Sequence, residues 1–211
     1  MTPVKNIIFD YGGVILNIDH QLPIQAFYEL GLQDFGSLYS HAIQSHLFDH
    51  LETGKIYPVE FYQQIREISG LELTNHQIET AWNTIILDMP EHRIRLLEKL
   101  KLKYRLFLLS NTNIIHYKVY SKQLLEQYGY HFEDLFEKVY FSFKLGIKKP
   151  DPEVFHLLIR ENHLIPSETL FIDDSNQNIL GAKSIGLKSL LLLDGTDVSN
   201  LFDPQSMEFF Q

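Results

Sequence analysis

The sequence predicts an α/β protein in which a parallel, doubly wound sheet carries helices on both faces and a bundle of helices is inserted after the first strand. From residue 91 onward, apolar runs typical of buried strands alternate with segments whose apolar residues recur every three or four positions. From residue 17 to residue 90, only the helical spacing recurs. We therefore expect a core domain of residues 1–16 and 91–211, and a helical domain of residues 17–90.

The first strand is the apolar run of residues 7–9, and it ends at Asp10. Gly12 and Gly13 follow, a pair typical of a tight turn. Open α/β sheets bind ligands at the carboxyl ends of their strands, so Asp10 is expected at a functional edge. An aspartate at this place also suits the cap of a turn or a helix, and the first strand alone does not distinguish the two interpretations.

The helical block is divided by glycines and prolines that stop and start helices. We expect helices at residues 22–30, 37–50, 59–69 and 75–87. Their apolar faces carry enough aromatic side chains for a separate small core, namely Phe27, Tyr28, Phe48, Phe61, Tyr62 and Trp82. Phe48 and Trp82 also suit the wall of a sugar pocket, although aromatic residues in a helical bundle more often form its core. His41, His46 and His50 recur at roughly helical spacing, but we reject a zinc site because no matching carboxylate accompanies them.

Helix and strand alternate through the second half of the chain. The expected helices are residues 91–102, 115–127, 153–163 and 177–185, and the strands after them are residues 104–111, 138–143, 169–173 and 188–193. Parallel strands bring their carboxyl ends to one edge of a sheet, even where those ends are far apart in the sequence. The polar residues at these ends are therefore expected to meet Asp10.

The groups expected at this edge are Asp10, Ser110 and Asn111, the pair Asp173 and Asp174, and Lys149. Adjacent carboxylates repel each other, so a bound cation explains their placement most easily. Oxygen ligands without cysteine favour a hard ion, and Mg²⁺ is the usual partner of phosphates. A serine hydroxyl and an ammonium group suit an oxyanion-rich substrate. Taken singly, the aspartate pair also suits helix caps, Lys149 a solvated surface, and Ser110 a simple turn.

The composition is acidic, with 18 Lys+Arg against 27 Asp+Glu and a formal net charge of −9, which opposes non-specific attraction to nucleic acid or anionic membranes. The absence of cysteine excludes disulfides, thiolate metal sites and cysteine nucleophiles. No apolar run approaches the length of a membrane span, and no signal-type segment precedes the first strand. We expect a cytoplasmic protein, a monomer or weak homodimer, that binds a small phosphorylated metabolite and neither nucleic acid nor membrane.

The order of these motifs resembles that of phosphatases of the haloacid dehalogenase (HAD) superfamily. The four motifs are residues 7–14, residues 108–111, Lys149-Pro150-Asp151-Pro152 and residues 171–178. The resemblance implies a Rossmann-like core with a helical cap between the first two motifs. The chain is also similar to sugar-1-phosphate phosphatases, such as those of α-D-glucose 1-phosphate, in Ser110-Asn111-Thr112-Asn113 with His116, in Leu145-Gly146, and in Asp173-Asp174 with Asn178.

The resemblance implies a role for each residue that matches a family motif. Asp10 matches the nucleophile, which forms an aspartyl-phosphate. Ser110 and Lys149 match the groups that hold the phosphoryl group. Asn111 suits a phosphate contact or a backbone-positioning contact, and a structural role in a turn suits it equally. The implied activity is hydrolysis of a small phosphomonoester.

A metal site is implied by the same resemblance. Asp10, the backbone oxygen of Gly12 and Asp174 match the ligands of Mg²⁺. Asp173 and Asn178 fall where the family places supporting polar residues.

Gly12 departs from the family pattern, because most of these phosphatases have an aspartate there that acts as general acid and base. Such a group is typically worth about a hundredfold or more in rate. A sugar 1-phosphate suits a site without it, since an anomeric hydroxyl leaves more easily than an ordinary alcohol, and an acyl phosphate suits it equally. Alternatively, Asp19 or His116 supplies the proton, although a plain position on a helix surface suits His116 equally well. Asn113 is a further candidate substrate contact.

Two other functions remain open from the sequence. A 2-haloacid dehalogenase uses an aspartate nucleophile on the same fold and needs no metal, but a bulkier residue than Gly12 is expected there. A catalytically impaired binding protein of this fold also accounts for the missing acid. A phosphomutase is disfavoured because it usually retains that acid.

Overall fold

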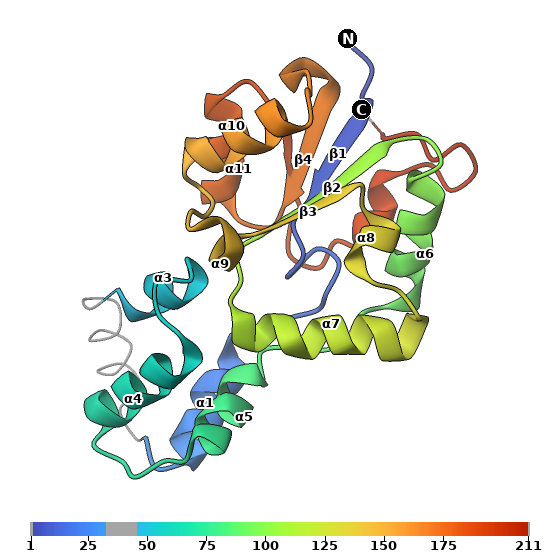
Figure 1. Ribbon diagram of the computed structural model, residues 1–211. Coiled ribbons are helices and arrows are strands. Elements are labelled where there is room, and N and C mark those ends of the chain that lie inside the picture. Colours follow the sequence, from blue (N-terminus) through green and yellow to red (C-terminus); the bar gives the residue numbers. More distant parts are fainter. Residues whose placement is uncertain (1, 33–45, 211) are drawn as a thin grey trace.

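A five-stranded sheet lies at the centre of the protein (Figure 1). In the computed structural model, which describes residues 2–32 and 46–210, the strand order is β3-β2-β1-β4-β5 and every neighbouring pair is parallel. The strands are β1 (Asn6–Phe9), β2 (Arg105–Ser110), β3 (Lys138–Phe141), β4 (Thr169–Asp173) and β5 (Lys188–Leu191). The chain starts at the central strand, moves out to one edge and then returns to build the other. This is the doubly wound topology predicted from the sequence.

Side chains that alternate along β1 divide the core into two layers. Ile7 and Phe9 belong to the cluster covered by α6, α7 and α8, and Ile8 belongs to the cluster covered by α10 and α11. These helices are α6 (Glu91–Leu100), α7 (Ile114–Tyr128), α8 (Phe132–Leu135), α10 (Pro152–Glu161) and α11 (Asn176–Ser184). Because helices bury both faces, the central strands read as continuous apolar runs.

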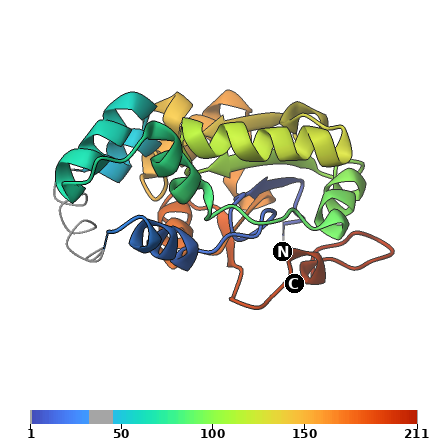
Figure 2. The same ribbon diagram turned by 90° about the horizontal axis from the view of Figure 1, so that it is seen from below.

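The segment between β1 and β2 folds into helices that surround a core of their own. They are α1 (Gln21–Glu29), α3 (Leu47–Glu52), α4 (Pro58–Ser69) and α5 (Asn75–Asn83), and they lie beside the start of α7 (Figures 1 and 2). Phe27 and Phe61 are buried in this core, and Ile115 of α7 joins it. Tyr28 was expected there but is exposed, on a part of the α1 surface that the other helices of the bundle do not cover. We propose that this bundle corresponds to the separate domain of residues 17–90.

The two linkers between the bundle and the sheet run side by side. Ile18 and Ile86 form an antiparallel bridge, and the Asp19 amide donates to the Ile85 carbonyl at 3.0 Å. The helix expected at residues 75–87 therefore ends early, at Asn83, because the chain beyond it pairs with the other linker.

The other local differences from the expected elements are small. The strand expected at residues 138–143 ends at Phe141, and α9 (Ser142–Leu145) follows it. The Ser142 hydroxyl bonds both the amide and the carbonyl of Thr112, at 2.9 Å each, which draws the chain away from the sheet at this point. Of the helix expected at residues 37–50, only the end is described, as the start of α3, and His41 lies outside the described residues.

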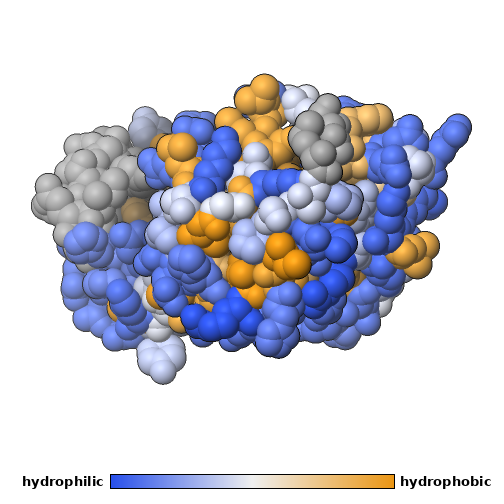
Figure 3. Space-filling model, turned by 90° about the horizontal axis from the view of Figure 1, so that it is seen from above, coloured by the Kyte–Doolittle hydropathy of each residue, from blue (hydrophilic) through white to orange (hydrophobic). Residues whose placement is uncertain are grey.

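The face shown in Figure 3 is mostly hydrophilic, and its hydrophobic residues form several separate areas. Within residues 2–32 and 46–210, no helix combines the length and the apolarity that crossing a bilayer requires.

Candidate active site

Carboxylates meet where β1 and β4 end. Asp10 follows β1, Asp173 is the last residue of β4, and Asp174 follows it. These two strands are neighbours, with Phe9 paired to Ile172. One oxygen atom of each carboxylate lies within 4.8 Å of the other two. The structure thus brings together the side chains that the strand ends were expected to bring together, while the roles given to them stay predictions.

Lys149 lies inside this group of carboxylates and is fully buried. Its Nζ lies 2.8 Å from Oδ1 of Asp10 and 2.7 Å from Oδ2 of Asp173. A buried ammonium is costly unless it is paired, and two carboxylates pair it here. The expected alternative of a solvated surface lysine is therefore wrong.

Burial governs protonation in this group. It raises the pKa of Asp10 to about 7, because the nearby ammonium of Lys149 offsets only part of the desolvation and Asp173 adds repulsion. Burial and the charge of Asp173 also raise the pKa of Asp174. Burial opposes the charge of Lys149, but Asp10 and Asp173 outweigh it and raise the pKa of the ammonium. Three carboxylates around one ammonium leave surplus negative charge at this edge.

Asp173 is held by groups of the following turn. Its Oδ1 accepts hydrogen bonds from the Ser175 amide at 2.8 Å and from Nδ2 of Asn178 at 2.9 Å. Its Oδ2 contacts Lys149, so both oxygens are engaged. Asp173 and Asn178 therefore lie where supporting residues were expected, whereas Asp174 is exposed to solvent.

The two glycines after Asp10 differ in backbone conformation and in the atoms that a side chain would contact. Gly13 has a φ of +74°, and a Cβ there would lie 2.0 Å from Oδ2 of Asp174, so a larger residue would be strained and would displace the Asp174 carboxylate. Gly12 has ordinary backbone geometry, but a Cβ there would lie 3.2 Å from Cδ1 of Ile18. A tight turn was predicted at these two glycines, but the close approach of Asp174 to Gly13 was not predicted.

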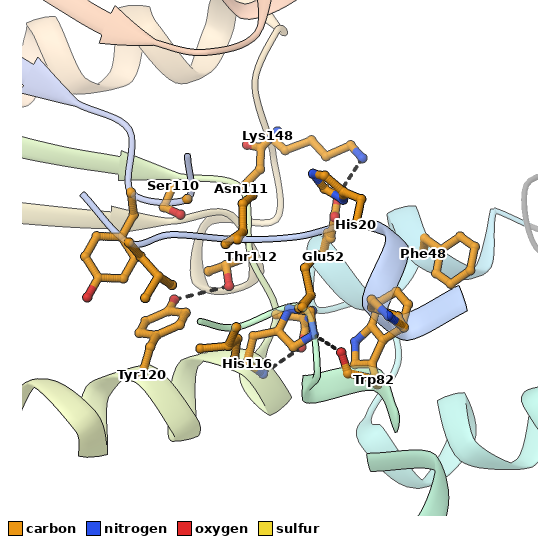
Figure 4. Close-up of a pocket in the computed structure, with 18 of the residues that line it drawn as sticks. His20, Phe48, Glu52, Trp82, Ser110, Asn111, Thr112, His116, Tyr120 and Lys148 are labelled. Carbon is orange, nitrogen blue, oxygen red and sulfur yellow. Dashed lines mark hydrogen bonds and ion pairs between the residues drawn. The ribbon is translucent and has the colours of Figure 1, made fainter. Parts of the chain in front are cut away.

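A cavity of about 820 Å³ opens beside this edge, between the sheet and the helical bundle. Gly12 and Ser110 contribute to its wall on the sheet side, and Figure 4 shows Ser110 together with residues from the bundle. Most of the remaining wall is apolar or aromatic: Tyr11, Leu16, Ile18, Pro23, Ile24, Phe48, Trp82, Ile85, Ile86 and Tyr120. The volume suits a small metabolite.

Ser110 and Asn111 end β2 in different ways. The Ser110 hydroxyl makes no hydrogen bond within the part of the chain that the structure describes, so it is available to a ligand in the cavity. The Asn111 side chain is already engaged, since its Nδ2 donates to the Lys149 carbonyl at 2.8 Å and its Oδ1 accepts from the Lys149 amide at 2.9 Å. Of the two roles expected for Asn111, the structure shows backbone positioning.

Asn113 and His116 form the start of α7. The Asn113 Oδ1 caps the helix by accepting from the amides of Ile115 and His116, at 3.0 Å each. The His116 ring lies 3.1 Å from Nδ2 of Asn113 and, through Nε2, 3.2 Å from the Trp82 carbonyl, and it stacks on the Trp82 ring at 5.2 Å (Figure 4). Burial lowers the pKa of His116 to about 4. The expectation of a plain surface histidine is wrong, because His116 lies in the contact between α7 and the bundle.

Asp19 lies on the linker to the bundle, where its Oδ1 accepts from the Gln21 amide at 2.8 Å and caps the start of α1. It is absent from the described lining of the cavity.

Sequence reasoning missed an ionic contact across the cavity. Lys148 reaches from the sheet domain to α3, where its Nζ lies 2.5 Å from Oδ1 of Asp49 and 2.7 Å from Oε2 of Glu52. The spacing of Asp49 and Glu52 places both on one side of a helix turn, but nothing in the sequence indicates that Lys148 meets them. Phe48 and Trp82 stack at 5.2 Å and line the same cavity, and both also pack against the bundle core, so the two alternatives given for them from the sequence hold together.

Comparison with known proteins identifies the family. The model of the haloacid dehalogenase-like hydrolase family matches residues 4–186. The chain is 36% identical over 194 residues to a D-ribitol-5-phosphate phosphatase from Bacteroides thetaiotaomicron, and the match covers 92% of this chain and 94% of that protein.

Solved structures agree with this assignment. A HAD family enzyme from Bacteroides thetaiotaomicron superposes with a TM-score of 0.90 at 37% identity, covering 96% of this chain and all of that one. A complex of that enzyme with magnesium and inorganic phosphate, the ligands expected from the sequence, has a TM-score of 0.87 at 37% identity over 95% of this chain and 100% of that one. The predicted resemblance to HAD phosphatases and the predicted enzyme class are confirmed. The chain belongs to the haloacid dehalogenase-like hydrolase family.

Proposed function

We propose that the chain is a Mg²⁺-dependent phosphatase that transfers the phosphoryl group of a small sugar or polyol phosphate to Asp10 and then to water. One observation carries this proposal. A buried carboxylate, Asp10, is paired with Lys149 beside two further carboxylates, at the edge of a cavity large enough for a small metabolite. The likeness to a D-ribitol-5-phosphate phosphatase supports the substrate class.

The residues at this edge fit a magnesium ion. The donor set consists of carboxylate oxygens, which hard divalent cations prefer, and its negative charge exceeds that of the one ammonium. Asp10, Asp174 and the backbone oxygen of Gly12 would hold the ion. When bound, Mg²⁺ supplies positive charge beside the phosphoryl oxygens.

The first step forms a bond between a carboxylate oxygen of Asp10 and phosphorus and breaks the bond to the ester oxygen, which leaves as an alcohol after taking a proton. Oδ1 of Asp10 is held by Lys149 and by the Tyr11 amide, which lies 2.6 Å away. This leaves Oδ2 without a bond to the described residues. Lys149 and the free hydroxyl of Ser110 would neutralise and orient the phosphoryl oxygens.

Water then attacks phosphorus of the aspartyl-phosphate, which releases inorganic phosphate and restores the carboxylate. Asn111 contributes to both steps by holding the backbone of Lys149, and it does not contact the reacting atoms in our proposal.

We infer that water, rather than His116 or Asp19, supplies the proton for the leaving group. With a pKa of about 4, His116 is neutral at pH 7, and its ring nitrogens face Asn113 and the Trp82 carbonyl. Asp19 caps α1 instead. We therefore propose a substrate whose leaving group departs without a general acid, such as the anomeric oxygen of a sugar 1-phosphate. The alternative is a terminal phosphate ester, as in the name of the D-ribitol-5-phosphate phosphatase.

Steady-state hydrolysis of an aryl phosphate, sugar 1-phosphates, terminal polyol phosphates and acyl phosphates with and without Mg²⁺ tests the proposal. We expect Mg²⁺-dependent turnover in the wild type, none in Asp10→Asn, and normal turnover in Asp194→Asn, a matched change at an exposed carboxylate far along the chain. Acid-quenched enzyme should carry one phosphoryl group on the peptide that contains Asp10. Turnover by Asp10→Asn, or metal-independent halide release from a 2-haloacid with no phosphatase activity, would contradict it.

A further inference from the structure

The cavity has a charged side formed by Lys148, Asp49 and Glu52. Figure 4 shows the Lys148 amine and Glu52 between Ser110 and Phe48 in this view. All three side chains line the cavity, and the ammonium lies within 2.7 Å of an oxygen of each carboxylate. A ligand bound through its phosphate near Ser110 would therefore extend toward this group.

The charges of this group do not balance. Two carboxylates face one ammonium, so the group carries a surplus of one negative charge. Among the described residues that line the cavity, Lys148 is the one lysine or arginine, and it is already paired. A second anion on the ligand would meet repulsion here and no free cation.

The same side offers hydrogen-bonding groups to a neutral ligand. A carboxylate accepts about four hydrogen bonds. Glu52 uses part of this capacity on Lys148, and Asp49 uses part of it on Lys148 and on His46, whose Nδ1 lies 3.6 Å from Oδ2 of Asp49. Hydroxyl groups of a ligand donate hydrogen bonds, so they suit the carboxylate oxygens that remain.

We propose that Asp49 and Glu52 determine specificity by rejecting phosphate esters that carry a second anionic group and by accepting hydrogen bonds from the hydroxyls of an uncharged polyol or sugar. This inference rests on the proposed phosphatase function and narrows its substrates. Aldonic acid phosphates and bisphosphates are excluded by charge, while neutral polyol monophosphates are accepted.

A matched pair of substrates tests the inference. One is a pentitol 5-phosphate, and the other is the pentonate 5-phosphate, in which a carboxylate replaces the hydroxymethyl group at the far end. The measured quantity is the ratio of kcat/KM for the pentitol ester to kcat/KM for the pentonate ester. Glu52→Gln removes one negative charge, and at about 8 Å such a change alters the ratio by roughly three- to thirtyfold, depending on the effective dielectric constant.

The variants are expected to move this ratio in opposite directions. Glu52→Gln and Asp49→Asn lower it, whereas Lys148→Met, which leaves both carboxylates unpaired, raises it. Added salt shrinks these differences, because it screens charge and leaves shape unaffected. Glu72→Gln, at an exposed carboxylate outside the cavity lining, keeps the wild-type ratio.

Failure of the inference and failure of the proposed function look different. No Mg²⁺-dependent hydrolysis of an aryl phosphate by the wild type would overturn the proposed function. Hydrolysis of the aryl phosphate with no preference for the pentitol ester would overturn the inference. So would an equal loss of activity on both esters in Glu52→Gln, since that result assigns the ionic group a purely structural role between α3 and the sheet domain.

Discussion

The metal-free protein is expected to lose stability as the pH rises toward 7, and Mg²⁺ is expected to restore it. The reason is the pKa of Asp10, which burial raises from 3.8 to about 7. Between these values the folded protein binds more protons than the unfolded chain, so stability decreases with increasing pH. A carboxylate with a lowered pKa would show the opposite sign.

The size of the effect follows from the shift of Asp10. A shift from 3.8 to about 7 corresponds, at about 1.4 kcal/mol per pKa unit, to at most about 4 kcal/mol of unfolding free energy. For a chain of this length, each kcal/mol changes Tm by roughly 2–4 °C. Mg²⁺ binds the charged carboxylates, and a concentration a hundredfold above its Kd adds about 2.7 kcal/mol. Below pH 7 protons compete for Asp10, so the gain from Mg²⁺ is smaller there.

Thermal unfolding in EDTA and in excess Mg²⁺, at about pH 5.5 and about pH 8, measures this difference. We expect Mg²⁺ to raise Tm by several degrees more at the higher pH. Asp10→Asn cannot ionise, so in EDTA it should be more stable than the wild type at the higher pH and should lack most of the pH dependence. If Asp10→Asn in EDTA follows the wild-type pH profile, or if the gain from Mg²⁺ is equal at both pH values, the assignment to Asp10 is wrong.

Three further substitutions test single contacts. Gly13→Ala should weaken Mg²⁺ binding in calorimetric titration, because its Cβ would lie 2.0 Å from Oδ2 of Asp174, one of the proposed metal ligands. Gly146→Ala, with a similar positive φ and open space, should cost only about 1 kcal/mol of stability. Asn111→Ala should lower kcat and destabilise the fold by about 1–3 kcal/mol in urea unfolding, because two bonds to the Lys149 backbone are lost; unchanged kcat would contradict the positioning role. Hydrogen bonds that outweigh its burial hold the pKa of Asp197 well below its usual range. Asp197→Asn should therefore be about 1–3 kcal/mol less stable than the wild type at pH 7, and this difference should begin to shrink as the pH falls below about 4 and disappear only at much lower pH.

The fold and the inner part of the site could be predicted because they depend on patterns within single segments. Buried strands read as apolar runs, and the topology of a parallel sheet carries their ends to one edge whatever the residues between them. Asp10 and Asp173 are adjacent for this reason. The prediction needed no knowledge of how the helices pack.

The outer part of the site could not be predicted, because it depends on how the helical bundle sits against the sheet domain. From the sequence, His116 is a surface residue of α7, but in the structure its ring contacts the carbonyl and the ring of Trp82. Lys148 looks like a solvated lysine until α3 brings Asp49 and Glu52 to it. These contacts join residues far apart in the sequence through side chains, and no periodicity records them.

Gly12 shows most directly what the sequence could not predict, because the structure gives its lack of a side chain a different explanation. In the sequence it is a missing acid, which suggests an empty place beside the nucleophile. In the structure Ile18 fills that place, 3.2 Å from where a Cβ at Gly12 would lie, and Ile18 is bridged to Ile86 in the paired linkers. A side chain at position 12 would thus press on the end of the Ile18 side chain, which would have to shift by a few tenths of an ångström. Both residues line the cavity, so the residue type at position 12 and the position of Ile18 in the cavity wall depend on each other.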